Sequence, residues 1–153
     1  MIVVGVDGSS AGDLALETAL ELAGDGEPVL VVWAWRELSG DFGLPYDRLI
    51  HPSSADIERE WAERTSAEAA EKAKAAGHPA EAVAPHGKPS KVLCAPARER
   101  DARLIVVGSS GWGAVEGLGM SSVSAAVLHS APRRVVVVRS APGARSEATT
   151  EGP

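Results

Sequence analysis

Residues 106–124 read VVGSSGWGAVEGLGMSSVS. The stretch leaves an apolar run, crosses a glycine-rich loop and reaches serines that are typical of a helix start. Glycines let a ligand approach the backbone closely, and the first amides of a helix point toward any bound anion. This order of strand, loop and helix predicts a phosphate site. The alternative is an ordinary surface loop that needs turn residues for its shape.

The candidate ligand groups lie at the two ends of this stretch. They are Val107, Gly108, Ser110 and Gly111 where it begins, and Ser121, Ser122, Val123 and Ser124 where the helix starts. The amides of the second group head the predicted helix, and its serine hydroxyls add hydrogen-bond donors. No lysine lies in the stretch, so it is not a Walker A loop.

Short apolar runs alternate with longer segments of helical period along the rest of the chain. We expect strands at residues 2–6, 29–35, 80–84, 104–107 and 135–138, and helices that begin near residues 10, 54, 88 and 122. This alternation is typical of βαβ units around a parallel sheet that helices cover on both faces. Residues 36–53 contain turn residues, and we expect a long surface loop there that can cover a ligand.

Capping and breaking residues place the ends of the helices. Ser9 or Ser10 is suited to cap the first helix, and Gly77 is suited to end the second. Proline is favourable in a first turn, so we expect the third helix to begin near Pro89. Pro96 then falls inside that helix, which we expect to be kinked or short.

Size and charge limit the classes of function. The chain of 153 residues fits one domain, expected over residues 1–140, with a disordered tail over residues 141–153. Its 21 acidic and 15 basic residues give a formal net charge of -6, which argues against nucleic-acid binding. The single cysteine excludes an intrachain disulfide, and no apolar run approaches the roughly 20 residues of a membrane span. We therefore expect a cytoplasmic protein.

The spacing of glycines and serines in residues 108–122 is similar to the signature of the universal stress protein family. That signature reads Gly-x-x-Gly, nine residues, then Gly followed by Ser or Thr. Here Gly108 and Gly111 form the first pair, and residues 112–120 are the nine. VVGVDGS at residues 3–9 also resembles the family's first strand and its aspartate turn. The likeness covers nearly the whole chain.

This resemblance implies a fold and a ligand. The fold is a doubly wound, open parallel sheet of five strands in the order 3-2-1-4-5, of the Rossmann-like adenine nucleotide alpha hydrolase type, with a crevice between strands 1 and 4. The ligand is adenine nucleotide, ATP or AMP, with Mg²⁺ held mainly by the phosphates. Asp7 would then contact adenosine, Val6 would be one of the nucleotide-binding residues, and the backbone near Ala34 would face the adenine edge. From local sequence alone, Asp7 reads as an Asx turn or a helix cap.

Ser121 departs from the signature, which has glycine at this position. If the backbone needs a positive φ there, a residue other than glycine costs about 1 kcal/mol or somewhat more and puts phosphate affinity in doubt. The serine hydroxyl is alternatively an extra phosphate donor. Trp112 is also unusual in its bulk, and it either shelters the ligand or packs on the surface.

No catalytic centre is recognisable in the sequence. The serines lack a Gly-x-Ser-x-Gly elbow, and the histidines lack the spacing of metal ligands. The resemblance therefore implies a regulatory or stress-adaptation protein that binds adenine nucleotide and is not an enzyme. A weak ATP hydrolase and a partner-binding module with a degenerate nucleotide site are the alternatives.

The last predicted strand implies a partner of the same kind. Val135, Val136, Val137 and Val138 are wholly apolar and lie at the edge of the expected sheet. Exposed edges of this kind usually pair with another chain, and members of the family commonly pair there antiparallel. We therefore expect a homodimer.

Overall fold

The computed structural model describes residues 1–35, 54–110 and 120–139. Within these ranges, five parallel strands form one sheet in the order β3-β2-β1-β4-β5. The strands are β1 (Ile2–Gly5), β2 (Val29–Val32), β3 (Ala80–Val83), β4 (Leu104–Gly108) and β5 (Arg134–Val138), and the helices are α1 (Ser10–Leu22), α2 (Ser54–Ala75), α3 (Pro89–Glu99) and α4 (Ser122–Ser130). The expected fold class and strand order are confirmed. The loop expected at residues 36–53 and the tail expected at 141–153 lie outside the described residues.

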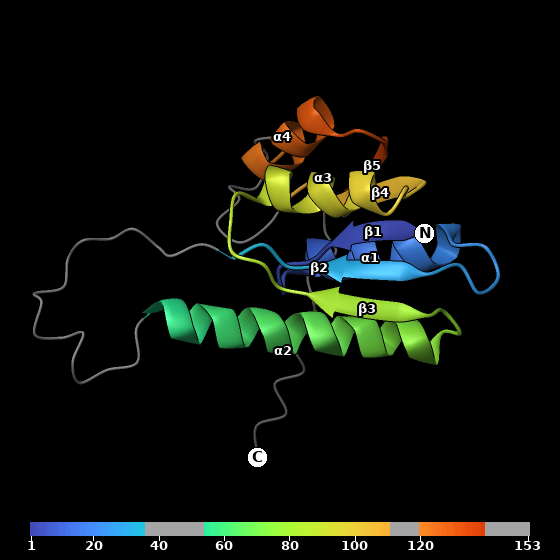
Figure 1. The fold of residues 1–153 in the computed structure, drawn as a ribbon, viewed down its shortest axis with the longest axis horizontal. Helices are drawn as coiled ribbons and strands as arrows, with labels where there is room; N and C mark the ends of the chain where they lie inside the picture. The colour runs from blue at the N-terminus through green and yellow to red at the C-terminus, as the bar shows by residue number, and fades with distance from the viewer. Residues whose placement is uncertain (36–53, 111–119, 140–153) are drawn as a thin grey trace, which may run out of the picture.

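Side chains of the strands alternate between two apolar layers. On one face, Val4 packs with apolar residues of α1 and α2, among them Ala15. On the other face, Ile105 packs with Leu93 of α3 and Val127 of α4. Figure 1 shows α2 along one side of the sheet and α3 and α4 along the other. Because helices cover both faces, the central strands are almost wholly apolar.

The helix ends largely follow the predicted signals. Ser9 is the cap of α1, and Gly77 ends α2 with a φ of +93°. Helix α3 begins at Pro89 and continues for three residues beyond Pro96, so Pro96 does not shorten it. Apolar residues of α3 on both sides of the proline are buried against the sheet, and this burial offsets the lost backbone hydrogen bond. Among the described helices, none combines the length and apolar character that a membrane span requires.

Strand β2 is shorter than predicted. It ends at Val32, three residues before the expected end at Trp35. Beyond it, Trp33 N donates to a carbonyl of β3 at 3.0 Å, and Trp35 forms an isolated parallel bridge with His86. After the regular strand has ended, the chain therefore continues beside the end of β3 and the residues that follow it. The bounds of the other four strands lie within one residue of those predicted.

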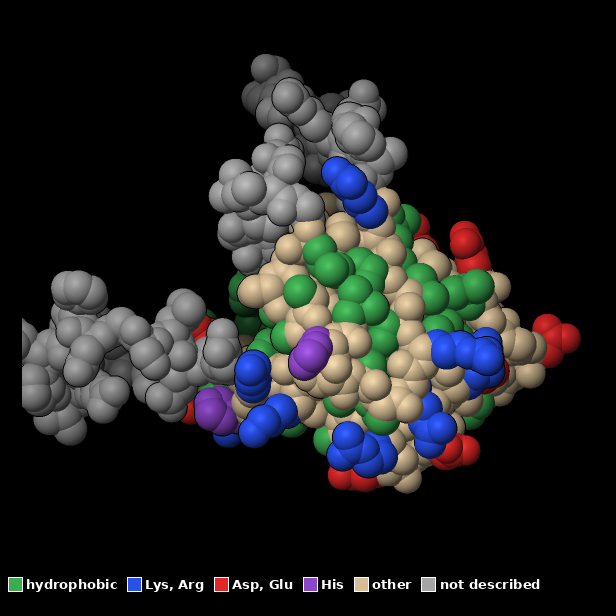
Figure 2. All heavy atoms as spheres, turned by 90° about the horizontal axis from the view of Figure 1, so that it is seen from above, with side chains coloured by type: hydrophobic (Ala, Val, Ile, Leu, Met, Phe, Trp, Pro, Cys, Tyr) green, Lys and Arg blue, Asp and Glu red, His purple; other side chains and the backbone are tan. Residues whose placement is uncertain are grey.

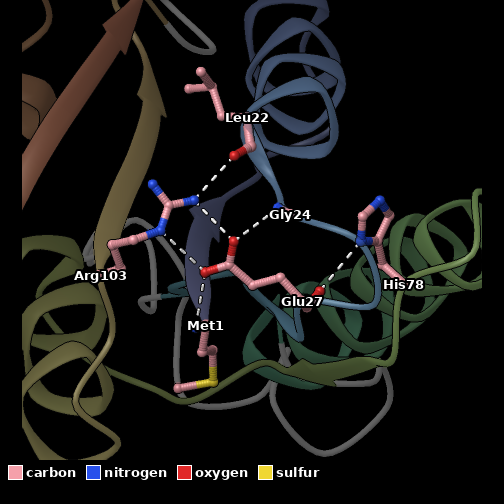
Figure 3. Close-up of polar contacts among 6 residues, drawn as sticks. All are labelled: Met1, Leu22, Gly24, Glu27, His78 and Arg103. Carbon is pink, nitrogen blue, oxygen red and sulfur yellow. Dashed lines mark hydrogen bonds and ion pairs between the residues drawn. The ribbon is translucent and has the colours of Figure 1, made fainter.

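A cluster of polar contacts around Glu27 joins the amino ends of three strands (Figure 3). Glu27 precedes β2, and its carboxylate pairs with Arg103 before β4 at 2.8 Å and with the Met1 ammonium before β1 at 2.9 Å. Arg103 also donates to the carbonyl of Leu22 at the end of α1. The hydrogen bonds from Arg103 hold the pKa of Glu27 well below its ordinary value. This cluster lies at the amino ends of the strands, opposite the carboxyl ends that carry the predicted site.

Candidate functional site

The carboxyl ends of β1 and β4 lie side by side at one edge of the sheet. Val4 is opposite Val106 in the parallel register, so Asp7 and Ser109, each three residues further along, leave the sheet at the same edge. The direction in which the chain adds strands reverses between β1 and β4, because β2 and β3 extend the sheet on one side of this pair and β5 extends it on the other. Open α/β sheets bind ligands in the crevice at such a point. The structure thus brings together the two segments that the sequence singled out.

Asp7 closes the turn between β1 and α1. Its Oδ1 accepts hydrogen bonds from Ser9 N at 3.0 Å and from Ser9 Oγ at 2.5 Å, which makes an Asx turn. Ser9 Oγ in turn accepts from Gly12 N at 3.2 Å. Within the described residues, Oδ2 of Asp7 has no hydrogen bond, and the side chain is half-buried. The turn therefore uses one carboxylate oxygen and leaves the other as an acceptor.

Two glycines keep this turn in place. Gly8 has a φ of +73°, and a β-carbon on it would lie 3.1 Å from the Trp33 ring. Gly12 faces the carboxylate, because a β-carbon there would lie 2.8 Å from Asp7 Oδ1. Gly12 and Trp33 were not predicted as supports of Asp7. The available signal was a glycine in the first turn of a helix, where glycine is otherwise unfavourable.

Gly108 ends β4 where α1 comes closest to the sheet. A β-carbon on Gly108 would lie 2.8 Å from the carbonyl oxygen of Ala11 and 2.9 Å from its Cβ. The φ of Gly108 is not positive. Glycine is therefore required here by the close packing of helix on strand, in addition to any approach of a ligand.

Hydrogen bonds tie the start of α4 to the ends of β4 and β5. Ser121 is the N-cap of α4, and its Oγ accepts from Ser124 N at 3.1 Å. Ser124 Oγ is buried, lies 2.8 Å from Ser121 Oγ and donates to Gly108 O at 2.5 Å. Ser121 N donates to Ser109 O at 2.6 Å, and Ser109 N donates to Val138 O at 2.7 Å. The first turn of α4 is thus fixed beside the carboxyl end of β4.

The backbone of Ser121 corrects one expectation. The sequence raised the prospect that this position needs a positive φ, whereas its φ is −63° and its ψ is 156°. Any residue adopts this conformation, and serine is among the best residues for a helix N-cap. The serine is accommodated without backbone strain, so any effect on a ligand must come from its hydroxyl.

Exposure separates the other predicted residues. Ser122 and Val123 are exposed in the first turn of α4, and Ser110 is half-buried after β4. The side chains of Val6 and Val107 are buried in opposite apolar layers. Those two valines can therefore offer a ligand only their backbone groups.

Ala34 lies beyond β2 with its peptide groups turned toward β1. Trp33 N and Trp35 N both donate to carbonyls on the β3 side, at 3.0 and 3.3 Å. Peptide groups alternate in direction along an extended chain, so those of Ala34 point to the opposite side, where β1 leaves the sheet. This is the place predicted for the adenine edge.

The described residues contain no group of three or more His, Cys, Asp or Glu side chains that could hold a metal ion. The predicted residues Gly111 and Trp112 lie outside the described part of the chain.

Comparison with known proteins gives a family and relatives. The family model described as the universal stress protein family matches residues 1–139. Universal stress protein Rv2005c of Mycobacterium tuberculosis is 32% identical over 145 residues. That match covers 90% of this chain but 45% of the relative, so the chain spans about half the length of that protein.

Solved structures share the fold over most of their length. UspA from Lactobacillus plantarum has a TM-score of 0.76 and 20% identity, covering 90% of this chain and 96% of its own. A universal stress protein in complex with cAMP has a TM-score of 0.67 and 28% identity, covering 92% and 97%. The protein from Archaeoglobus fulgidus in complex with dAMP has a TM-score of 0.57 and 25% identity, covering 89% and 94%. With this fold and a family match over residues 1–139, the chain belongs to the universal stress protein family.

Proposed function

We propose that this chain binds adenine nucleotide, ATP or AMP, in the crevice between β1 and β4 and acts as a regulatory or stress-adaptation protein. The observation that carries the proposal is the convergence of Asp7, Gly108 and the start of α4 at one sheet edge. This edge offers a carboxylate acceptor on the β1 side and helix amides on the β4 side. A nucleoside with hydroxyl donors and an attached phosphate matches both groups.

Asp7 is proposed as the nucleoside acceptor. Its Oδ1 is held by Ser9, so the carboxylate is fixed in orientation before any ligand arrives. Its Oδ2 is then the acceptor for a sugar hydroxyl. A hydrogen bond to a charged and half-buried acceptor contributes about 1.5–3 kcal/mol to binding.

Two of the structural relatives support the ligand class. They are the complexes with cAMP and with dAMP, at 28% and 25% identity to this chain. Both ligands combine adenine, a sugar and a phosphate. ATP and Mg²⁺ are proposed here by extension, with the cation held by the phosphates.

The chain is proposed to bind its ligand without turning it over. The hydroxyls of Ser121 and Ser124 hydrogen-bond to each other, and the latter donates to the carbonyl of Gly108. Neither hydroxyl donates to a histidine or a carboxylate among these contacts, so neither is activated as a nucleophile. The ATP hydrolase alternative predicts turnover of ATP, which the same preparation can be assayed for.

A homodimer through β5 is also proposed. In the described chain, β5 pairs with β4 on one side and forms the edge of the sheet on the other. Val123 and Leu128 of the neighbouring α4 are exposed. Figure 2, seen from the side of α3 and α4, shows apolar side chains gathered in a band over this face. A second copy would pair with the outward backbone groups of β5 and would also cover the exposed apolar surface.

Calorimetric titration with AMP and with ATP plus Mg²⁺ tests the proposal. The informative pair of variants is Asp7→Asn, which keeps an oxygen for the Ser9 turn, and Asp7→Ala, which removes it. Both should lose about 1–3 kcal/mol of binding free energy, because both lose the charged acceptor. Only Asp7→Ala should also lose about 1 kcal/mol of folding stability.

The controls separate binding from folding. Denaturant unfolding of each variant gives its stability, and a folded Asp7→Asn that binds AMP like the wild type would show that Asp7 does not contact the nucleoside. Wild-type protein that binds neither AMP nor ATP at millimolar concentration would remove the proposed function and favour a partner-binding module.

A further inference from the structure

The hydroxyl of Ser121 accepts a hydrogen bond from the Ser124 amide, which would otherwise be available to a phosphate. Ser124 is the third residue of α4, and its N–H donates to Ser121 Oγ at 3.1 Å. The amides of Ser122 and Val123 come before it in the same turn. Amides of a first helical turn that lack an internal partner are the groups that bind anions. Ser121 therefore removes one of three consecutive amides from the proposed phosphate side.

This internal cap is held from several directions. Ser121 Oγ is 2.8 Å from Ser124 Oγ, which is itself fixed by donating to Gly108 O at 2.5 Å. The backbone of Ser121 is fixed by its hydrogen bond to Ser109 O. A phosphate that used the Ser124 amide would have to displace the hydroxyl and break this network. The network thus opposes the phosphate and leaves the nucleoside side of the crevice unchanged.

We propose that Ser121 sets the ligand selectivity of this site by limiting the contribution of the phosphate, so that AMP and ATP bind more weakly relative to adenosine than they would if the Ser124 amide were free. The inference rests on the proposed nucleotide site and adds which ligand class it favours. Ser121 then acts through the hydrogen bond of its hydroxyl and not through backbone strain, since its φ is ordinary.

Two substitutions separate the hydroxyl from the rest of the side chain. Ser121→Ala removes the hydroxyl and frees the Ser124 amide, while Ser121→Thr keeps a hydroxyl at the same place and serves as the matched control. Affinities for adenosine, AMP and ATP are measured by calorimetry on the whole chain. Ser121→Ala should bind AMP and ATP about tenfold tighter and adenosine unchanged, the size expected for one added hydrogen bond to a charged group. Ser121→Thr should behave as the wild type.

Other outcomes overturn the inference in distinguishable ways. Selective weakening of AMP and ATP by Ser121→Ala would make the hydroxyl a phosphate donor, and an unchanged ratio of AMP to adenosine affinity would make it irrelevant. If the wild type binds adenosine and AMP but Ser121→Ala changes neither affinity, the proposed function stands and only this inference fails. If even adenosine fails to bind, both are lost.

A measurement on the wild type keeps the inference testable if Ser121→Ala does not fold. Amide resonances of α4 are followed during titration with AMP. The Ser122 and Val123 amides should shift as the site fills, and the Ser124 amide should shift least because its partner does not change. The largest shift at Ser124 would contradict the inference.

Discussion

At the scale of single residues, Gly108 allows α1 to pack closely on β4, and Ser121 caps α4. The sequence marked Gly108 and Ser121 as candidate ligand-binding residues, since glycines after a strand and serines before a helix are recognisable patterns. It did not show the packing of Gly108 or the hydrogen bonds of Ser121. The contact of Gly108 with Ala11 joins segments nearly 100 residues apart in the chain, and local sequence patterns do not predict such a contact.

Substitution of Gly108 by alanine should destabilise the fold strongly. The added β-carbon would lie 2.8 Å from a backbone oxygen of α1, which cannot move aside like a flexible side chain. A loss of about 2–3 kcal/mol in the free energy of unfolding is expected from such overpacking, measured by urea denaturation. Gly24→Ala is the matched control, because its β-carbon would meet only Glu27 Oε2 at 3.9 Å. Equal stabilities of the two variants would contradict the packing argument.

Asp7 shows how two interpretations of one residue can both be needed. Local sequence read it as an Asx turn, and the family resemblance read it as an adenosine contact. The structure confirms the turn through Oδ1. The contact with adenosine stays a prediction, and it depends on Oδ2, which has no hydrogen bond within the described residues.

At the scale of elements, the amino ends of β1, β2 and β4 are joined by Glu27 while their carboxyl ends form the proposed site. Only 15% of the Glu27 side chain is exposed, so its ion pair with Arg103 is better shielded than most surface pairs. The cluster ties these amino ends together, opposite the carboxyl ends that form the proposed site. No sequence pattern indicated this pairing, because its partners are 76 residues apart.

Glu27→Gln should make stability less dependent on acid pH. Arg103 lowers the pKa of Glu27 in the folded protein, so the carboxylate stabilises the fold above its unfolded pKa near 4.5, and that stability is lost as the pH falls below this value. The variant should be about 1–2 kcal/mol less stable at pH 7, with the difference shrinking below pH 4.5. Denaturant unfolding across pH 3 to 8 measures it.

The exposed pair of Glu81 and Arg100 provides the control for this experiment. Arg100 also lowers the pKa of Glu81, but 55% of that side chain is exposed and solvent screens the pair. Glu81→Gln should therefore change stability by less than about 0.5 kcal/mol. Equal effects of the two substitutions would show that the Glu27 cluster is no more than another surface pair.

Most element boundaries could be predicted, and the exceptions have tertiary causes. Ser9, Gly77 and Pro89 placed helix ends because capping depends on neighbouring residues. Helix α3 runs past Pro96 because its apolar face is buried on both sides of the proline. Strand β2 ends early although its apolar run continues to Trp35, because regular pairing requires a partner strand as well as a suitable sequence.

At the scale of the whole molecule, the edge strand β5 predicts the oligomeric state. Val138 O accepts from Ser109 N on the β4 side, so the alternation of the strand turns the peptide groups of Val137 outward. Val137→Pro should therefore remove an outward amide, keep the pairing with β4 and convert a dimer into a monomer in sedimentation analysis. Circular dichroism checks that the variant is folded. A wild-type monomer at micromolar concentration, or a folded Val137→Pro dimer, would argue against the β5 interface.

The overall topology was the most predictable property of the chain. Alternating apolar runs and helical segments indicate a parallel sheet, and the family resemblance supplies the strand order that the structure confirms. The site is less predictable because it combines residues from β1, β2, β4 and α4. Its polar geometry, above all which atoms are already hydrogen-bonded, follows from contacts that sequence patterns do not contain.

The central claim is that adenine nucleotide binds where β1 and β4 end, and titration of labelled wild-type protein with AMP, followed by amide chemical shifts, tests it most directly. The account predicts saturable shifts concentrated in residues 6–9, near Ala34, in residues 107–110 and in the first turn of α4. Shifts concentrated instead around Glu27 and Arg103 at the opposite edge, or no saturable shifts at millimolar AMP, would contradict it.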